Sequence, residues 1–306
     1  MKKILVVILI LALFIVAGCN KDVVEDGPFV GGTNGVSISF QEGTPISEFV
    51  VEDSIPVKVV LKNSGENDVL TGQAEVKLYG LLMQEYSLDE SYKVVNQNII
   101  GLKKDVVEEG GEAVVDMGTL KYTGVYSNSL EPVLKAKVCY PYKTISTITA
   151  CASSREIIEA GGESTCVIDG EKISTTKVSS SPMQVTSFTE QLSGKDSVTF
   201  RVVIENRGIG EVYKDDQTCT NLDIPVTKSE SQDKIKFTVT PEDITCTTYE
   251  GTQSNSGYIK LETGKKTLIC NMKVNNAGSN YIRQININLD FKYMESVSKQ
   301  LKILEA

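Results

Sequence analysis

The chain has 306 residues, of which 41% are hydrophobic and 23% are charged, and its net charge is −9. This balance is typical of a folded protein and excludes a largely disordered one, and the acidic charge argues against a nucleic-acid partner. The chain has no histidine, which excludes Ser-His-Asp and Cys-His nucleophiles and histidine-ligated metals. No carboxylates, lysines, tyrosines or cysteines cluster in a catalytic pattern, so we predict no catalytic residue, no cofactor and no metal.

The first residues of the chain have the pattern of a secretion signal. Lys2 and Lys3 precede an apolar stretch over residues 4–18. That stretch is shorter than the roughly 20 residues that a membrane-spanning helix needs, and its length is typical of a signal peptide. It ends in "VAGC", which resembles the lipobox of secreted lipoproteins, so we expect residues 1–18 to be a signal peptide and Cys19 to carry lipid.

The alternatives are a plain signal peptide or a short anchor helix followed by an incidental cysteine. Residues 20–34, "NKDVVEDGPFVGGTN", are rich in Gly, Asp and Asn and show no period, which indicates a tether, so 19–34 is the lipidated cysteine and tether. The lipid on Cys19 makes the membrane a partner. We therefore expect an extracytoplasmic protein that is anchored to the outer face of the cell membrane.

Beyond the tether, short runs alternate between apolar and polar residues, as in "GVSISF", "IPVKVVLKN" and "LKAKVCYPY". They are separated by Gly, Asn, Asp and Ser, and no stretch has a long helical period. This pattern predicts an all-β protein built from β-sandwiches.

The second half of the chain repeats the first. "VKVVLKNSGENDV" at 57–69 aligns with "FRVVIENRGIGEV" at 200–212, which matches Asn63 with Asn206 and Gly65 with Gly208. We interpret this turn motif as a strand that ends in a turn with left-handed backbone, which Asn and Gly adopt readily. The alternative is an Asn-Gly loop that binds a ligand.

A second match lies near the end of each half, where "VCYPYKT" aligns with "LDFKYME". The aligned apolar residues are expected on one core face: Val138, Tyr140 and Tyr142, with Leu289, Phe291 and Tyr293. We expect hairpins that turn at Ile145 and Ser296. They would place Cys139 opposite Cys151 and Asp290 opposite Lys302, as a disulfide and an exposed ion pair.

Strands that lead into "LKNSG" and "IENRG", followed by a late hairpin, resemble the immunoglobulin-like domains of the CARDB type, which recur in tandem on archaeal and bacterial surface proteins. The resemblance covers about residues 35–153 and 183–306. It implies two tandem immunoglobulin-like sandwiches, separated by a linker at 154–182, in a family associated with adhesion and surface display. The six additional cysteines depart from the common form of that family, and no catalytic residues carry over.

Six cysteines remain if Cys19 takes lipid, and an even number outside the cytoplasm indicates disulfides. Besides Cys139–Cys151, the other four cysteines allow three connectivities. Of these we favour Cys246–Cys270, which would join neighbouring strands, with Cys166–Cys219, which would tie the linker to the second domain. No C-x-x-C motif occurs, which argues against structural zinc. Asp215, Asp216 and Asp223 could supply oxygen ligands for calcium, but solvated loop acids explain them better.

These observations predict a lipid-anchored surface protein with a non-catalytic role in display, adhesion or binding of an envelope protein or glycan. A solute-binding lipoprotein is one alternative, which would need a two-lobed cleft. An envelope enzyme subunit that uses paired carboxylates is another, and a pure spacer is the third.

Overall fold

The computed structural model describes residues 27–124, 129–159, 166–274 and 280–305. The predicted signal peptide and the lipidation of Cys19 lie outside these residues. The protein is all-β, as predicted. Its strands are β1 Val36–Phe40, β2 Glu48–Val50, β3 Ile55–Asn63, β4 Glu75–Tyr79, β5 Lys93–Val94, β6 Glu112–Leu120, β7 Val133–Ser153, β8 Met183–Leu192, β9 Ser197–Asn206, β10 Glu211–Tyr213, β11 Lys234–Thr240, β12 Ile244–Thr247, β13 Gln253–Ser254, β14 Ser256–Lys260, β15 Lys265–Lys273, β16 Asn280–Gln300 and β17 Lys302–Leu304.

The helices are short: η1 Met83–Tyr86, α2 Arg155–Glu159, η2 Thr175–Lys177, η3 Asn221–Asp223 and α3 Pro225–Ser231. Within the described parts of the chain, no helix is long and apolar enough to cross a membrane. The strands form because their apolar residues alternate: in β3, Ile55, Val57, Val59 and Leu61 are buried and their neighbours are not.

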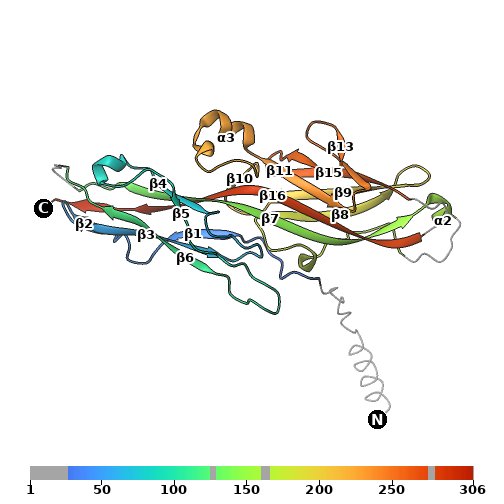
Figure 1. The fold of residues 1–306 in the computed structure, drawn as a ribbon, viewed down its shortest axis with the longest axis horizontal. Helices are drawn as coiled ribbons and strands as arrows, with labels where there is room; N and C mark the ends of the chain where they lie inside the picture. The colour runs from blue at the N-terminus through green and yellow to red at the C-terminus, as the bar shows by residue number, and fades with distance from the viewer. Residues whose placement is uncertain (1–26, 125–128, 160–165, 275–279, 306) are drawn as a thin grey trace, which may run out of the picture.

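Two sandwiches lie end to end along the long axis and share one sheet (Figure 1). In sandwich 1, the sheet β1-β3-β6 packs over one half of the shared sheet. In sandwich 2, the sheet β13-β12-β15-β9-β8 packs over the other half. The shared sheet has the order β14-β11-β16-β7-β4-β5, with β10 also paired to β16. The small parallel pair β17-β2 closes the far end of sandwich 1.

The two long strands β7 and β16 join the sandwiches. They pair antiparallel over their whole length, from Asn280 opposite Ser153 to Gln300 opposite Val133. Each strand therefore contributes one half to each sandwich. The predicted hairpin turns are wrong, because Ile145 and Ser296 both lie inside these continuous strands.

The aromatic residues of the second repeat match lie where β7 and β16 pair. Tyr142 stands opposite Phe291 and Tyr140 opposite Tyr293, and all four side chains are buried on one face. The prediction that these residues form core is confirmed. Tyr140 and Tyr293 have ring centroids 6.0 Å apart in an edge-on arrangement that favours aromatic packing.

Three disulfides join the described cysteines, and Cys246–Cys270 is as predicted, across the paired strands β12 and β15. The predicted pairs Cys139–Cys151 and Cys166–Cys219 are wrong, since the structure joins Cys139 to Cys219 and Cys151 to Cys166. The reason is the missing hairpin: with β7 continuous, Cys139 and Cys151 lie far apart on one strand.

The predicted ion pair between Asp290 and Lys302 is also absent, for the same reason. Asp290 instead lies 3.3 Å from Lys143 of the paired strand, and Lys302 lies 3.0 Å from Glu48.

Glu190 of β8 is an acidic side chain in the core of sandwich 2. Its Oε1 accepts a hydrogen bond of 2.9 Å from the Cys151 N–H, while its Oε2 is buried with no hydrogen-bond partner among the described residues. Burial raises the pKa of this carboxyl to about 7. Glu190 is therefore a titratable core group that lies apart from the turns described below.

Candidate binding surface between the sandwiches

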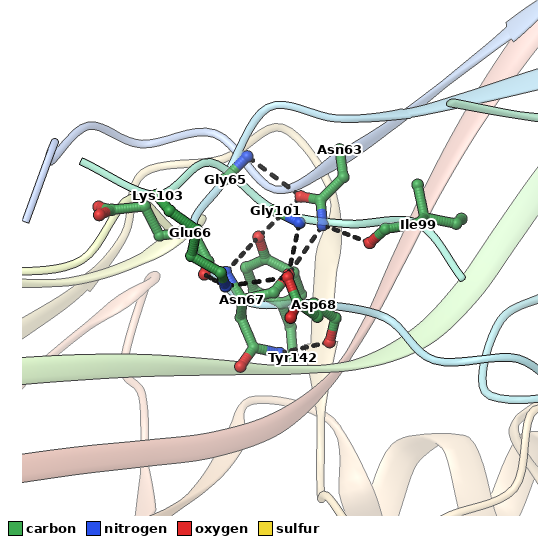
Figure 2. Close-up of polar contacts among 9 residues, drawn as sticks. All are labelled: Asn63, Gly65, Glu66, Asn67, Asp68, Ile99, Gly101, Lys103 and Tyr142. Carbon is green, nitrogen blue, oxygen red and sulfur yellow. Dashed lines mark hydrogen bonds and ion pairs between the residues drawn. The ribbon is translucent and has the colours of Figure 1, made fainter. Parts of the chain in front are cut away.

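The Asn63 motif builds a closed hydrogen-bond network at the end of β3, which we call turn 1 (residues 63–68; Figure 2). The buried Asn63 amide donates to the carbonyls of Asn67, at 2.8 Å, and Ile99, at 3.0 Å. Its Oδ1 accepts the Gly65 N–H, at 3.1 Å, and the Tyr142 hydroxyl, at 2.9 Å. All the polar atoms of this side chain are used inside the protein, so Asn63 is a structural residue and presents nothing to a ligand.

Turn 2 (residues 206–211) repeats this geometry after β9. The Asn206 amide donates to the Gly210 carbonyl at 3.0 Å, and its Oδ1 accepts the Gly208 N–H at 3.2 Å. The Tyr293 hydroxyl accepts the Gly210 N–H at 2.7 Å, just as the Tyr142 hydroxyl accepts the equivalent Asn67 N–H at 3.3 Å. The sequence repeat is therefore a repeat of hydrogen bonds.

The glycines serve a different purpose from the one predicted. Neither Gly65 nor Gly208 has the left-handed backbone that the sequence led us to expect. A Cβ on Gly65 would lie 2.1 Å from the Tyr142 hydroxyl oxygen, and a Cβ on Gly208 would lie 2.2 Å from that of Tyr293. Glycine is required because the tyrosine hydroxyl approaches the backbone closely.

Both turns meet the same segment at the junction of the sandwiches. The Glu66 N–H donates to the Ser180 carbonyl at 3.0 Å, and the Arg207 N–H donates to the Pro182 carbonyl at 2.7 Å. Ser180 and Pro182 are buried, although they lie in the stretch 154–182 that we predicted as a linker. The end of that stretch is thus packed between the two turns.

The N-terminal segment covers turn 1. The Glu66 carboxylate accepts backbone N–H groups from Val30 at 2.9 Å, Gly31 at 3.0 Å and Ser180 at 2.6 Å. The Phe29 N–H donates to the Thr176 carbonyl at 3.1 Å. The predicted tether is therefore docked on the protein from residue 27 onward.

Turn 2 has no such cover among the described residues. Ile209 occupies the position equivalent to Glu66, and its side chain is 88% exposed. Two hollows of about 350 and 220 Å³ flank this side chain, and both are lined by Ile209 and Glu295. Single exposed aliphatic residues are common on protein surfaces. Ile209 differs from the others in lying between two recesses, at a position where the other repeat is covered by the N-terminal segment.

The larger hollow is lined by residues of both repeats. Its lining includes Ser64 from turn 1, Arg207 and Gly208 from turn 2, and Pro182 from the segment between them. Of the four predicted turn residues only Gly208 lines this hollow, and the side chains of Asn63 and Asn206 are used in internal hydrogen bonds.

The smaller hollow lies on the outer face of the shared sheet, with Tyr79, Lys137, Glu211 and Lys228 in its lining. The ammonium groups of Lys135 and Lys137 lie 5.9 and 5.7 Å from the centroid of the Tyr79 ring. The Tyr79 ring is therefore already in cation–π contact with two lysines, and the hollow beside it carries charged groups of both signs.

Charged groups next to this hollow are paired. Asp223 accepts hydrogen bonds from Lys137 and Lys77 and, at 3.1 Å, from the Tyr92 hydroxyl. Burial favours the protonated form of Asp223, but the two lysines outweigh it and hold its pKa below the ordinary value. Cys219, disulfide-bonded to Cys139 of β7, fixes this segment against the sheet.

Glu211 lines the same hollow and is paired in a similar way. Its Oε2 accepts the Tyr213 hydroxyl at 2.7 Å and lies 3.0 Å from the Lys228 ammonium. These partners overcome burial and lower the pKa of Glu211. The carboxylate is therefore ionised and serves as a fixed acceptor.

The acidic loop that could have bound calcium is committed to other contacts. Asp215 accepts the Tyr258 hydroxyl at 2.7 Å, Asp216 lies 3.4 Å from the Lys214 ammonium, and Asp223 binds two lysines. In the part of the chain that the structure describes, no group of three or more acidic or cysteine side chains could hold a metal ion.

Sequence reasoning did not identify Ile209, Tyr79 or Lys137. A signal for Ile209 was present: the alignment of the repeats puts an apolar residue at a loop position where the first copy has Glu66. No comparable signal marks Tyr79 and Lys137, because strand pairing alone brings them together, with Tyr79 opposite Lys135.

Comparisons with known proteins assign no family. No family model matches the chain, and no curated protein matches it. Similar solved structures include the C-terminal globular domain of oligosaccharyltransferase from Pyrococcus abyssi, with 8% identity and a TM-score of 0.21. That match covers 89% of this chain and 50% of the other, so this chain spans about half the length of the solved one. At these values the similarity carries no functional argument.

Proposed function

We propose that this protein is a non-catalytic binding protein, anchored by lipid on Cys19 to the outer face of the cell membrane, which engages an envelope protein or glycan through turn 2. The observation that carries this proposal is the exposure of Ile209 between two hollows, at a position where the other repeat is covered by the protein's own chain. Water contact with an aliphatic side chain costs free energy, which a partner would recover on binding.

The disulfides support the location. Three of them join the described cysteines, which indicates an oxidising, extracytoplasmic environment. The signal-like start and the "VAGC" sequence before the tether agree with this environment and supply the anchor. The resemblance to CARDB-type surface domains belongs to the same proposal.

A binding role also suits the chemistry of the site. Asp223 and Glu211 are already paired with lysines, and the turn asparagines are used internally. What the surface offers is shape, an apolar contact and fixed charges, which are the elements of recognition.

The binding proposal is tested with Ile209→Ser and, as a matched control, Val106→Ser, which removes the exposed aliphatic side chain of another loop. Wild-type protein is immobilised and exposed to solubilised envelope protein and to isolated envelope glycans. We expect a retained component that soluble wild-type protein competes away and that Ile209→Ser fails to retain. Equal retention by Ile209→Ser and wild type would contradict a role for turn 2.

The anchor is tested by the intact mass of protein from a membrane fraction. We expect a chain that starts at Cys19 with a diacyl lipid and gains about six hydrogens on reduction of its disulfides. An unlipidated chain that starts at Met1 would remove the anchor from the proposal.

A further inference from the structure

The place where the anchor joins the folded protein determines how the protein can sit on a membrane. Gly27 is the first residue that the structure describes. Its N–H donates to the Thr176 hydroxyl at 3.1 Å, and its carbonyl accepts from the Lys104 ammonium at 2.8 Å. Gly27 is thus fixed at the junction of the sandwiches. In Figure 1 the blue N-terminal segment of the described chain runs along the long side opposite α3.

The chain between the anchor and this point is short. Residues 20–26 separate Cys19 from Gly27, which gives eight Cα-to-Cα steps. Fully extended, eight steps span at most about 28 Å.

Each sandwich extends further than this tether allows. The segment that holds Gly27 bridges to β7 at Ser146, through Val178. From Ser146 to the end of β7 at Val133, 13 steps of about 3.3 Å give about 43 Å, so sandwich 1 cannot stand between the junction and the membrane.

The length of sandwich 2 is also close to the greatest length that the tether can span. From Ser146 to Ser153, seven steps give about 23 Å, and the chain continues beyond into α2. Standing on this end would require a nearly fully extended tether, which loses most of its conformational entropy. A molecule that lies flat needs no such extension.

We propose that the anchored protein lies along the membrane, with the face around Gly27 and the Lys103–Val107 loop toward the lipid and the α3 face away from it. This inference rests on the proposed lipidation of Cys19. It places the hollow that is lined by Tyr79 and the α3 residue Lys228 on the side that incoming partners can reach.

The test uses full-length lipidated protein in phospholipid vesicles that contain an acceptor dye on the lipid headgroup. A donor fluorophore is placed, one position at a time, through a non-natural residue at Val106 or Val226, which are 80% and 66% exposed. Val106 lies on the membrane-facing loop and Val226 lies on α3, so the two make a matched pair. We expect at least twofold greater energy transfer from Val106 than from Val226.

Two further positions report whether the molecule lies or stands. Leu82 in sandwich 1 and Val167 beside Cys166 in sandwich 2 are 70% and 64% exposed. In a flat arrangement their transfer efficiencies differ less than those of Val106 and Val226. Equal transfer from Val106 and Val226, or a larger difference between Leu82 and Val167, would overturn the flat arrangement.

A lengthened tether provides the control. Twenty Gly-Ser residues inserted between Asp26 and Gly27 should reduce transfer from Val106 toward that from Val226, because the restraint is relieved. A wild-type protein that does not float with vesicles would overturn the anchor and the orientation together. A protein that floats but gives the wrong order of transfer would overturn the orientation alone.

Discussion

Turn 1 and turn 2 share a hydrogen-bond plan but differ in what surrounds them. In turn 1 the asparagine is fully buried and its amide also donates to the Ile99 carbonyl. The Glu66 carboxylate accepts backbone N–H groups of the N-terminal segment. In turn 2 the asparagine is half-buried and Ile209 is left in solvent. The turn of the first repeat is thus covered by the protein's own chain, whereas the equivalent position of the second repeat is exposed to solvent.

The largest difference is expected for the asparagines. Asn63→Ala leaves the Ile99 and Asn67 carbonyls, the Gly65 N–H and the Tyr142 hydroxyl without this partner, and should lower the free energy of unfolding by about 4 kcal/mol. Asn206→Ala loses fewer bonds at a more exposed site and should cost about 2 kcal/mol. Urea denaturation measures both, and equal losses would contradict the comparison.

The pH dependence of the free energy of unfolding should depend on Glu190 and not on the two turns. The pKa of Glu190, about 7 in the folded protein, lies above its ordinary value, so the folded state holds this proton more tightly. The associated stability is fully present below about pH 4.5 and is lost as the pH rises through 7, a decrease of about 3 kcal/mol. Glu190→Gln should flatten this slope, whereas Asn63→Ala should keep it. A slope unchanged by Glu190→Gln would refute the assignment.

Replacing a turn glycine by alanine should also lower the free energy of unfolding more in turn 1 than in turn 2. In Gly65→Ala the new Cβ meets the Asn34 carbonyl oxygen at 2.4 Å as well as the Tyr142 hydroxyl, so backbone has to shift. We expect a loss of about 3 kcal/mol. In Gly208→Ala the contacts are with side chains of Tyr293 and Pro182, and we expect about 2 kcal/mol. Thermal denaturation of both variants tests this order.

Removing the hydrogen bonds that hold the N-terminal segment on turn 1 should affect only the surrounding residues. Glu66→Ala deprives the Val30, Gly31 and Ser180 N–H groups of their acceptor and should cost about 1 kcal/mol. Hydrogen exchange at residues 29–31 should speed up more than tenfold, while exchange in β9 stays unchanged. Equal protection in variant and wild type would show that other contacts hold the segment.

The smallest effect on stability is expected at the open position. Ile209→Ser changes a side chain that packs against little, so the free energy of unfolding should stay within about 0.5 kcal/mol of wild type. Denaturation measured beside the binding assay checks this. A large loss of stability would mean that Ile209 supports the turn and is not a free contact point.

Local sequence patterns predicted the elements well and their long-range pairing poorly. Alternation in β3 and the repeat of Asn63 in Asn206 depend on nearby residues, and both were recovered. The continuity of β7 through Ile145 was missed, although "PYKTISTITA" is rich in β-branched Thr and Ile and has no Gly, Asn or Asp, a composition that favours a strand over a turn. That single error also produced the wrong partners for Cys139 and Cys151.

The candidate site shows the same limit. The turn motifs were found, but their conformational role was not, because the close approach of Tyr142 and Tyr293 depends on partners about 80 residues away. Exposure of Ile209 follows from what fails to cover it, which only the assembled structure shows.

The strands shared by the sandwiches also set the order in which the protein can fold. Sandwich 1 contains the C-terminal part of β16, paired from Met294 to Gln300 with β7, and its far end is closed by β17 against β2. The N-terminal sandwich is therefore incomplete until β16 and β17 have been synthesised and can pair. Folding of both sandwiches has to await these late strands, and a chain truncated before β16 loses a strand from both sandwiches at once.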